Sequence, residues 1–152
     1  MIKAEKSLKP GQYAVNLSDE IVEEIDNFAI GMFKDRADFL LFAVRDFTRQ
    51  IHKKTNRYEK SIYDTTKDLP RAIQESQDKI DDYLSKVKRR ADKFYSKDMS
   101  QITLYVTEMQ FKELSLFFNE KRALKNLQDF ARAAAVWELD EMSQLSGGYI
   151  EL

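Results

Sequence analysis

Cysteine is absent from this sequence of 152 residues, and histidine occurs once. The lack of cysteine excludes disulfides, thiolate metal sites and cysteine nucleophiles, and it argues against the disulfide-stabilised class of secreted domains. The length suits one domain, or two small ones that share a core. We therefore expect an intracellular protein that folds around an apolar core.

Long apolar runs are also missing. No segment approaches the roughly 20 consecutive apolar residues of a membrane-spanning helix. Residues 1–11 lack the apolar core that a signal peptide requires. These absences predict a soluble, cytoplasmic protein without a membrane partner.

Familiar catalytic motifs are absent as well. The sequence has no phosphate-binding loop, dinucleotide fingerprint, HExxH motif or nucleophile elbow. His52 stands in the lysine-rich stretch IHKK, which is typical of a solvated surface. The paired acids Glu23–Glu24 and Asp81–Asp82 fall on polar faces of predicted helices, so we expect no enzyme, metal site or cofactor.

The net charge of −1 does not favour a nucleic-acid partner, because domains that bind nucleic acids are commonly basic. The charge is unevenly distributed, however: +2 over residues 1–11, −4 over 12–51, +4 over 52–98 and −3 over the remainder. A polyanion would therefore meet the N-terminal arm and the middle of the chain first.

Residues 12–28 change their hydrophobic period halfway. Tyr13, Val15 and Leu17 alternate with smaller or polar residues, as in a strand with one buried face. Ser18 follows as a candidate N-cap, and the next apolar residues recur at helical spacing. The pattern predicts a strand that runs directly into a helix.

A second helix is predicted to begin at Asp35, with Asp38 three residues later in the manner of a capping box. Residues 12–51 therefore form one strand-helix-helix unit, which follows a basic arm at residues 1–11. The apolar face of the second helix comprises Phe39, Leu40, Phe42, Ala43, Phe47 and Ile51.

The same pattern occurs again in residues 100–142, before a tail at 143–152. Residues 101–106 alternate as a strand, and Thr107 with Gln110 forms a Thr-x-x-Gln capping box. The first helices match at an offset of 89, which pairs Phe111, Leu114, Phe117 and Phe118 with Val22, Ile25, Phe28 and Ala29. The second helices match at an offset of 88, which pairs Leu127, Phe130 and Ala131 with Phe39, Phe42 and Ala43.

Residues 52–99 are predicted to be a linker that contains one long amphipathic helix, at about 70–96. Ile73, Ile80, Val87 and Phe94 recur every seven residues within it. Such a stripe must be buried. It packs either on the two repeated units or on a second chain, which would make a homo-oligomer.

Two strands of this kind can pair into an antiparallel ribbon, with one face on the helices and one face free. A two-stranded ribbon fits the major groove of B-DNA, where Gln and Asn can bond adenine and Ala or Thr can touch the thymine methyl group. The outward residues would be Gln12, Ala14 and Asn16 on the first strand and Gln101, Thr103 and Tyr105 on the second.

The chain resembles the ribbon-helix-helix family of DNA-binding proteins, the Arc and MetJ class, in tandem. The first copy is YAVNLSDEIVEEIDNFA followed by FKDRADFLLFAVRDFTRQI, and the second is ITLYVTEMQFKELSLFF followed by LKNLQDFARAAAVWEL. The resemblance implies a mainly α fold with a short two-stranded antiparallel ribbon, in which both copies form a pseudo-dimer joined by a long helix. It also implies a regulator of transcription, acting as a repressor on double-stranded DNA in the nucleoid.

In that family the outward strand residues contact bases, and the N-terminus of the second helix holds a DNA phosphate on its backbone amides. The phosphate contacts implied for this chain are Lys34, Asp35, Arg36 and Ala37 in the first copy and Arg122, Ala123, Leu124 and Lys125 in the second. Lys9 and its neighbours in the arm would add contacts that do not depend on sequence.

Two departures from the family pattern leave an alternative open. Neither strand offers an outward Arg or Lys, and the second copy has no clear N-cap before its second helix. The alternative is a protein-interaction module, antitoxin-like or an adaptor, in which the ribbon is a scaffold. The long helix or the Gly147–Gly148 tail would then bind a protein partner.

Overall fold

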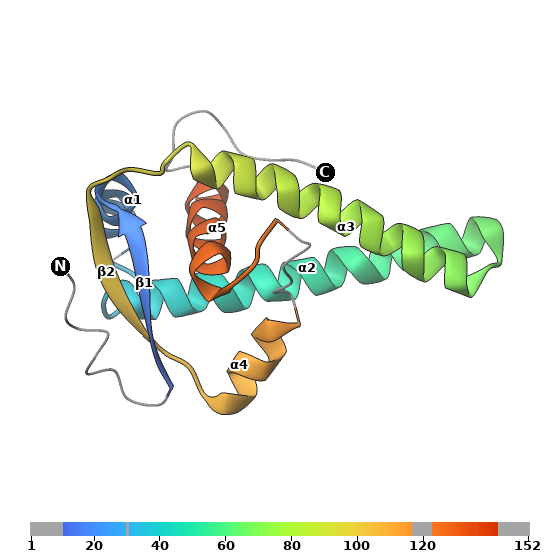
Figure 1. Cartoon of the computed structure of the whole chain (residues 1–152), viewed down its shortest axis with the longest axis horizontal. Helices are drawn as coiled ribbons and strands as arrows, with labels where there is room; N and C mark the ends of the chain where they lie inside the picture. Colours follow the sequence, from blue (N-terminus) through green and yellow to red (C-terminus); the bar gives the residue numbers. More distant parts are fainter. Residues whose placement is uncertain (1–10, 30, 117–122, 143–152) are drawn as a thin grey trace.

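The computed structural model of the chain describes residues 11–29, 31–116 and 123–142 (Figure 1). The protein is mainly helical with one two-stranded sheet, as predicted. Its elements in chain order are β1 (Gln12–Ser18), α1 (Asp19–Glu24), the π-helix η2 (Ile25–Ala29), α2 (Arg36–Thr66), α3 (Leu69–Asp92), β2 (Met99–Tyr105), α4 (Glu108–Ser115) and α5 (Leu127–Glu141).

The predicted antiparallel ribbon is confirmed. β1 pairs with β2 along its whole length, although more than 80 residues separate the two strands in the sequence. One face of the ribbon carries Val15, Leu17, Ile102 and Leu104, which are buried against α2 and α5. α2 packs on β2, and α5 packs on β1.

The predicted helix starts are confirmed at three caps. The Ser18 hydroxyl accepts from the Ile21 amide, and the Asp35 carboxylate accepts from the Asp38 amide at 2.8 Å. Thr107 and Gln110 form both hydrogen bonds of a capping box. These local bonds satisfy amides that the first turn of a helix leaves without intrahelical partners.

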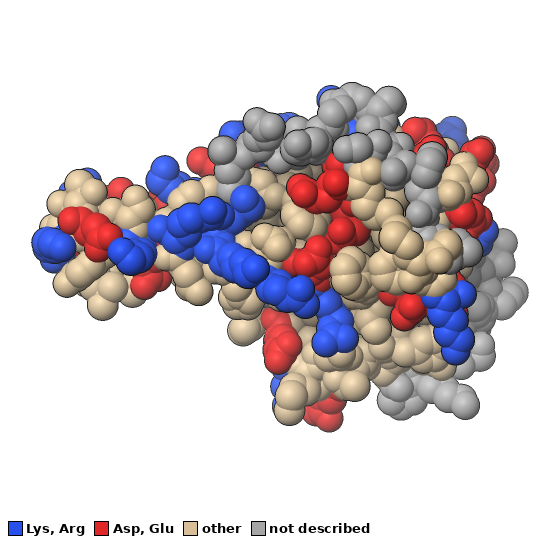
Figure 2. Space-filling model, turned by 180° about the vertical axis from the view of Figure 1, so that it is seen from behind, with Lys and Arg blue, Asp and Glu red and all other residues tan. Residues whose placement is uncertain are grey.

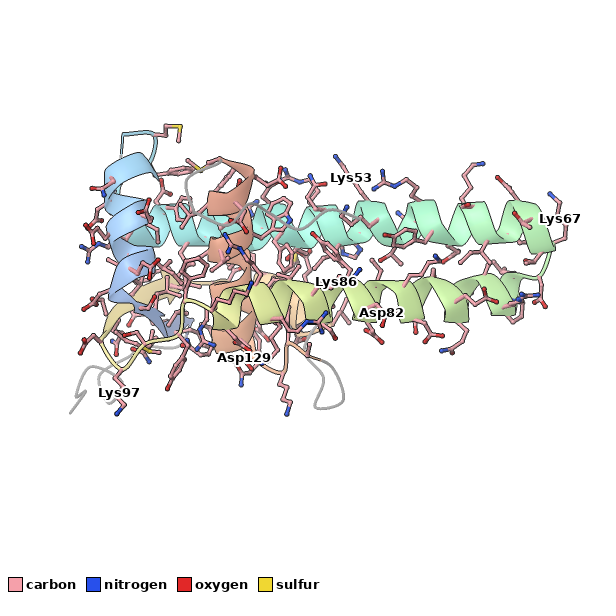
Figure 3. All side chains as sticks on the ribbon, turned by 90° about the horizontal axis from the view of Figure 1, so that it is seen from above. Lys53, Lys67, Asp82, Lys86, Lys97 and Asp129 are labelled. Carbon is pink, nitrogen blue, oxygen red and sulfur yellow. The ribbon has the colours of Figure 1, made fainter. Side chains whose placement is uncertain are left out.

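The prediction that the second helix ends near Ile51 is wrong. α2 continues to Thr66, where Lys67 adopts a left-handed conformation (φ 54°) and Asp68 caps α3. α2 and α3 form an antiparallel hairpin in which the two helices lie side by side (Figure 3). Residues 52–66 have only three large apolar side chains, Tyr58, Ile62 and Tyr63. This segment contacts α3 through two cation-π pairs, Lys54 with Tyr83 and Tyr58 with Lys79.

The apolar stripe of the long helix is covered within the same chain. Ile80 and Val87 are buried in α3, which packs on α2 and α5, and Phe94, two residues past the end of α3, is buried as well; Ile73, near the hairpin tip, is 41% exposed. The alternative in which the helix packs on the repeated units is therefore the one the structure contains. Only Ile73, at the hairpin tip, remains exposed on this stripe for contact with a second chain.

The predicted alignment of the two second helices is wrong by three residues. Asn126 caps α5 as Asp35 caps α2, and these caps are 91 residues apart. Phe130 therefore corresponds to Phe39, and both are fully buried. The residue that the sequence pattern pairs with Phe130, Phe42, is 42% exposed.

α5 crosses the hairpin at the end near the ribbon and packs on α2, α3 and β1 (Figure 1). Phe47 of α2 contacts Phe130 and Trp137 of α5, at ring-centroid distances of 5.2 and 5.5 Å. Arg90 of α3 donates two hydrogen bonds to the Asp140 carboxylate, at 3.0 and 2.8 Å, in a nearly solvent-free position. The Arg90 guanidinium and the Asp140 carboxylate are thus matched in charge and geometry, as a buried ion pair requires.

α4 lies apart from the other helices in Figure 1. It is connected to the body by Leu114, which is buried, and by Phe111, whose ring stacks on Tyr13 at 4.9 Å. Met109 and Leu116 are 73% and 71% exposed. Phe117 and Phe118, which the repeat assigns to the same apolar face, lie outside the described residues.

Among the described residues, no helix is long and apolar enough to cross a membrane.

Candidate nucleic-acid interface

The six residues that the sequence assigns to base contact lie together on the outer face of the ribbon. The register places them in three directly opposed pairs: Gln12 with Tyr105, Ala14 with Thr103, and Asn16 with Gln101. Opposed residues on one face are about 5 Å apart at Cβ. The face is therefore a compact surface of amides, a hydroxyl, a methyl group and a phenol, opposite to the helices.

Exposure differs across this face. Tyr105 is 61% exposed, and the other five residues are half-buried. The Gln101 side-chain oxygen is buried and has no hydrogen-bond partner in the part of the chain that the structure describes. Buried amide oxygens are normally bonded, so a donor on a base would reach this acceptor only after the Gln101 side chain turned outward.

A hollow of about 510 Å³ lies beside the β2 edge of the ribbon, where α2 begins. It brings the predicted phosphate contacts of the first copy next to the base-contact residues of the second strand. The residues that line it are Asp26, Lys34, Asp35, Arg36, Ala37, Gln101, Ile102, Thr103 and Tyr105.

The charge around this hollow is mixed. The Arg36 guanidinium donates to both oxygens of Asp26, at 2.8 and 2.5 Å, and this hydrogen bonding lowers the pKa of Asp26. The Lys34 amide donates to Asp38, whose own amide is taken by Asp35. Three carboxylates thus surround the start of α2, while the first-turn amides of Arg36 and Ala37 have no intrahelical acceptor.

The β1 edge of the ribbon has a different neighbour, the first turn of α5. The Gln128 side chain accepts a hydrogen bond from the Asn16 amide at 2.8 Å and donates one to the Asn16 carbonyl at 2.6 Å. Gln128 occupies the second position after the cap, as Ala37 does in α2. The amide side chain therefore fills the place that is hollow at the other edge.

Sequence patterns did not identify Gln128, because an amide near a helix start carries no distinctive spacing. They also placed the start of the second copy's second helix too early, because α5 begins at Leu127. Ala123, Leu124 and Lys125 precede the α5 cap, and Leu124 is buried (1% exposed), so these residues do not supply first-turn amides. Arg122 and Lys9 lie outside the described residues.

No cluster of three or more potential metal-binding side chains occurs within residues 11–29, 31–116 and 123–142.

No protein-family model matches this chain, and no curated protein or solved structure is significantly similar to it.

Proposed function

We propose that the chain is a tandem ribbon-helix-helix protein that binds double-stranded DNA in the major groove and represses transcription. The observation that supports this most directly is the strand register. Ser18 and Thr107 cap equivalent helices and are 89 residues apart. With that offset, a two-fold axis through the Ala14–Thr103 pair exchanges the Gln12–Tyr105 pair with the Asn16–Gln101 pair.

The packing of the helices supports the same arrangement. α2 packs on the strand of the other segment, and α5 does likewise, while the two helices pack on each other. Such crossed packing is what a symmetric dimer of strand-helix-helix subunits would produce. In a single chain it allows the two halves of the DNA-binding surface to differ.

The outer face suits A·T-containing sites. Asn16, Gln12 and Gln101 carry amides that can bond adenine bidentately, and Ala14 and Thr103 offer methyl groups for thymine. Tyr105 holds the position on the second strand that Asn16 holds on the first. The two half-sites are therefore expected to differ in sequence. Affinity for the phosphate backbone of DNA would come from Lys34 and the first-turn amides of α2.

The test is a fluorescence-anisotropy titration of genomic duplex fragments over a salt series. Specific binding predicts a preferred fragment, and the double variant Gln12→Ala/Asn16→Ala should lose about tenfold or more in affinity for it. The matched control is Gln74→Ala/Gln77→Ala, which removes two exposed amides from α3. If no fragment is preferred, or if both double variants bind alike, base contact by the ribbon is wrong.

A second candidate is the protein-interaction module. The carboxylates of Asp26, Asp35 and Asp38 at the start of α2 favour it, because they oppose a phosphate at that position. In this case Asp26→Asn would leave DNA affinity unchanged. Under the DNA-binding proposal, the same change would release the Arg36 guanidinium and increase affinity several-fold.

A further inference from the structure

The outward side of α2 carries a row of cations that the ribbon proposal does not use. We define the α2 basic band as Arg45, Arg49, Lys53, Arg57 and Lys60, all of which are exposed. The spacing of three or four residues places them along one side of the helix. The band is about 22 Å long, at 1.5 Å per residue.

Figure 2, which views the molecule from behind, shows Lys and Arg side chains as a nearly continuous band along the hairpin. Lys53 points away from α3 in Figure 3, toward solvent. The exposed positions of α2 from Phe42 to Lys60 include no Asp or Glu. The two acidic residues in that interval, Asp46 and Glu59, are half-buried.

Little of this charge is neutralised within the protein. Arg49 is 3.4 Å from Asp46, and Lys60 is 2.8 Å from Asp64; both are local pairs on the helix surface, of the kind that contribute little. For Arg45, Lys53 and Arg57, no ion pair occurs in the part of the chain that the structure describes.

The neighbouring residue Lys54 reflects the same accumulation of charge. Its ammonium group lies over the Tyr83 ring, at 5.1 Å from the centroid. Burial lowers the pKa of Lys54, and the positive charge of Arg57 lowers it further. Burial is the larger cause, and the negative charge of Glu141 acts in the opposite direction, so the effect of Arg57 on the pKa of Lys54 is secondary.

The composition of the band distinguishes between two classes of partner. Protein interfaces have a core enriched in aromatic residues, Met and Arg and depleted in Lys, whereas nucleic-acid interfaces are polar and strongly positive, so the discriminating feature is whether apolar residues accompany the cations. The exposed large apolar residues of α2 are Phe42 and Tyr63, which lie outside the interval from Arg45 to Lys60. Lys53 and Arg57 therefore offer charge without an exposed large apolar neighbour on α2, whereas Arg45 and Arg49 border a hollow that Leu114 and Leu116 of α4 also line.

We infer that the α2 basic band binds the phosphate backbone of a nucleic-acid duplex, separate from any duplex held by the ribbon. The ribbon lies at one end of the molecule, and the hairpin projects from the opposite side of the core (Figure 1). The outer face of the ribbon is turned away from α2 and α5, which cover its inner face. A protein with both surfaces occupied would bridge two duplex segments.

The inference is tested on the full chain with a labelled duplex of random sequence, so that specific contacts by the ribbon do not contribute. The variant Lys53→Glu/Arg57→Glu should bind at least tenfold more weakly. The slope of log affinity against log salt should fall by about two, one for each phosphate contact removed. The matched control, Lys86→Glu/Arg89→Glu, makes the same change in net charge on exposed positions of α3 and should bind like the wild type.

A second readout separates this inference from the ribbon proposal. The ribbon variant Gln12→Ala/Asn16→Ala should keep its affinity for the random duplex, even if the ribbon never contacts DNA. A bead assay rests on the proposed function as well: if the ribbon also holds a duplex, wild-type protein on beads that carry one duplex should capture a second, labelled duplex, and the band variant should not.

Three results would overturn the inference. The band variant binds the random duplex with the wild-type salt slope; the α3 control weakens as much as the band variant; or a poly-glutamate peptide binds the band more tightly than the duplex does, which would indicate an acidic protein partner.

Discussion

The two strand-helix-helix segments, residues 12–66 and 99–141, begin alike and differ in their helices. Both run from a seven-residue strand through a hydroxyl cap into a helix. In the first segment Ile21, Val22 and Ile25 are buried in the common core; in the second, α4 is a short helix with Met109 and Leu116 exposed. A shared local pattern thus determines where a helix starts but not where it packs.

The second helices show the same contrast. α2 extends into a hairpin with α3, whereas α5 ends at Glu141 and is tied to α3 by the buried Arg90–Asp140 pair. At the ribbon edge, Ala37 of α2 borders a hollow and the equivalent Gln128 of α5 bonds the Asn16 backbone. One half is therefore open to a ligand at a place where the other half is closed by its own side chain.

The largest expected effect tests the alignment of the two halves. Phe39→Ala and Phe130→Ala each remove a fully buried ring at the same position after the cap. We expect each to lower the free energy of unfolding by about 3–5 kcal/mol. Phe42→Ala should lower it by about 1 kcal/mol, the scale of its ring contact with Phe33. Urea denaturation measures all three, and equal losses for Phe42 and Phe130 would restore the offset of 88.

The next largest effect concerns pH and stability. The position that Phe47 holds in α2 is held in α5 by Glu138, a buried carboxyl group. Burial, followed by hydrogen bonding to Asp46, raises the pKa of Glu138 from 4.5 to about 8. The folded protein therefore holds a proton that the unfolded chain releases near pH 4.5. Stability should fall as the pH rises from 4.5 to 8, by up to about 1.4 kcal/mol per pH unit.

Glu138→Gln provides the comparison for this pH dependence. The amide keeps the shape and a hydrogen-bond donor for Asp46 but has no proton to lose. Thermal melts between pH 5 and pH 8 should show a falling midpoint for the wild type and a flatter profile for the variant. Parallel profiles would mean that Glu138 is ionised in the folded protein at pH 5.

A smaller effect concerns the two edges of the ribbon. Gln128→Ala removes both hydrogen bonds to the Asn16 backbone and should lower the free energy of unfolding by about 1–3 kcal/mol. Hydrogen exchange should show faster exchange of the Asn16 amide. If the chain binds DNA as proposed, the converse variant Ala37→Gln, which places an amide side chain at the open edge, should weaken that binding without loss of stability. Unchanged exchange at Asn16 would contradict this role for Gln128.

The smallest effect compares the two caps. Ser18→Ala and Thr107→Ala should each cost about 1 kcal/mol of helix stability. Because α1 is packed in the core, the Ser18 change should appear in global unfolding. α4 has few buried contacts, so the Thr107 change should appear as faster local hydrogen exchange in residues 108–115. Equal global losses would show that α4 is as firmly packed as α1.

Several features followed from the sequence alone, because short-range physics determines them. Alternation identified both strands, and side-chain oxygens at Ser18, Asp35 and Thr107 identified the helix starts. The repeat predicted that the strands pair, and a period of two then assigned Gln12, Ala14 and Asn16 to one face. The strand pairing followed from the long-range repeat, and each of the other features depends on residues within a few positions of one another.

Other features were decided only by tertiary structure. Residues 52–66 carry a weak apolar pattern, and packing on α3 rather than periodicity made them part of α2. By contrast, Asn126 caps α5 with Asp129 three residues later, the same spacing as Asp35 and Asp38, so this helix start was visible in the sequence but was not recognised there. The Gln128–Asn16 bonds and the Glu138–Asp46 pair join residues about 90 or more positions apart. Such contacts depend on where whole helices come to rest, and burial in three dimensions fixes that position.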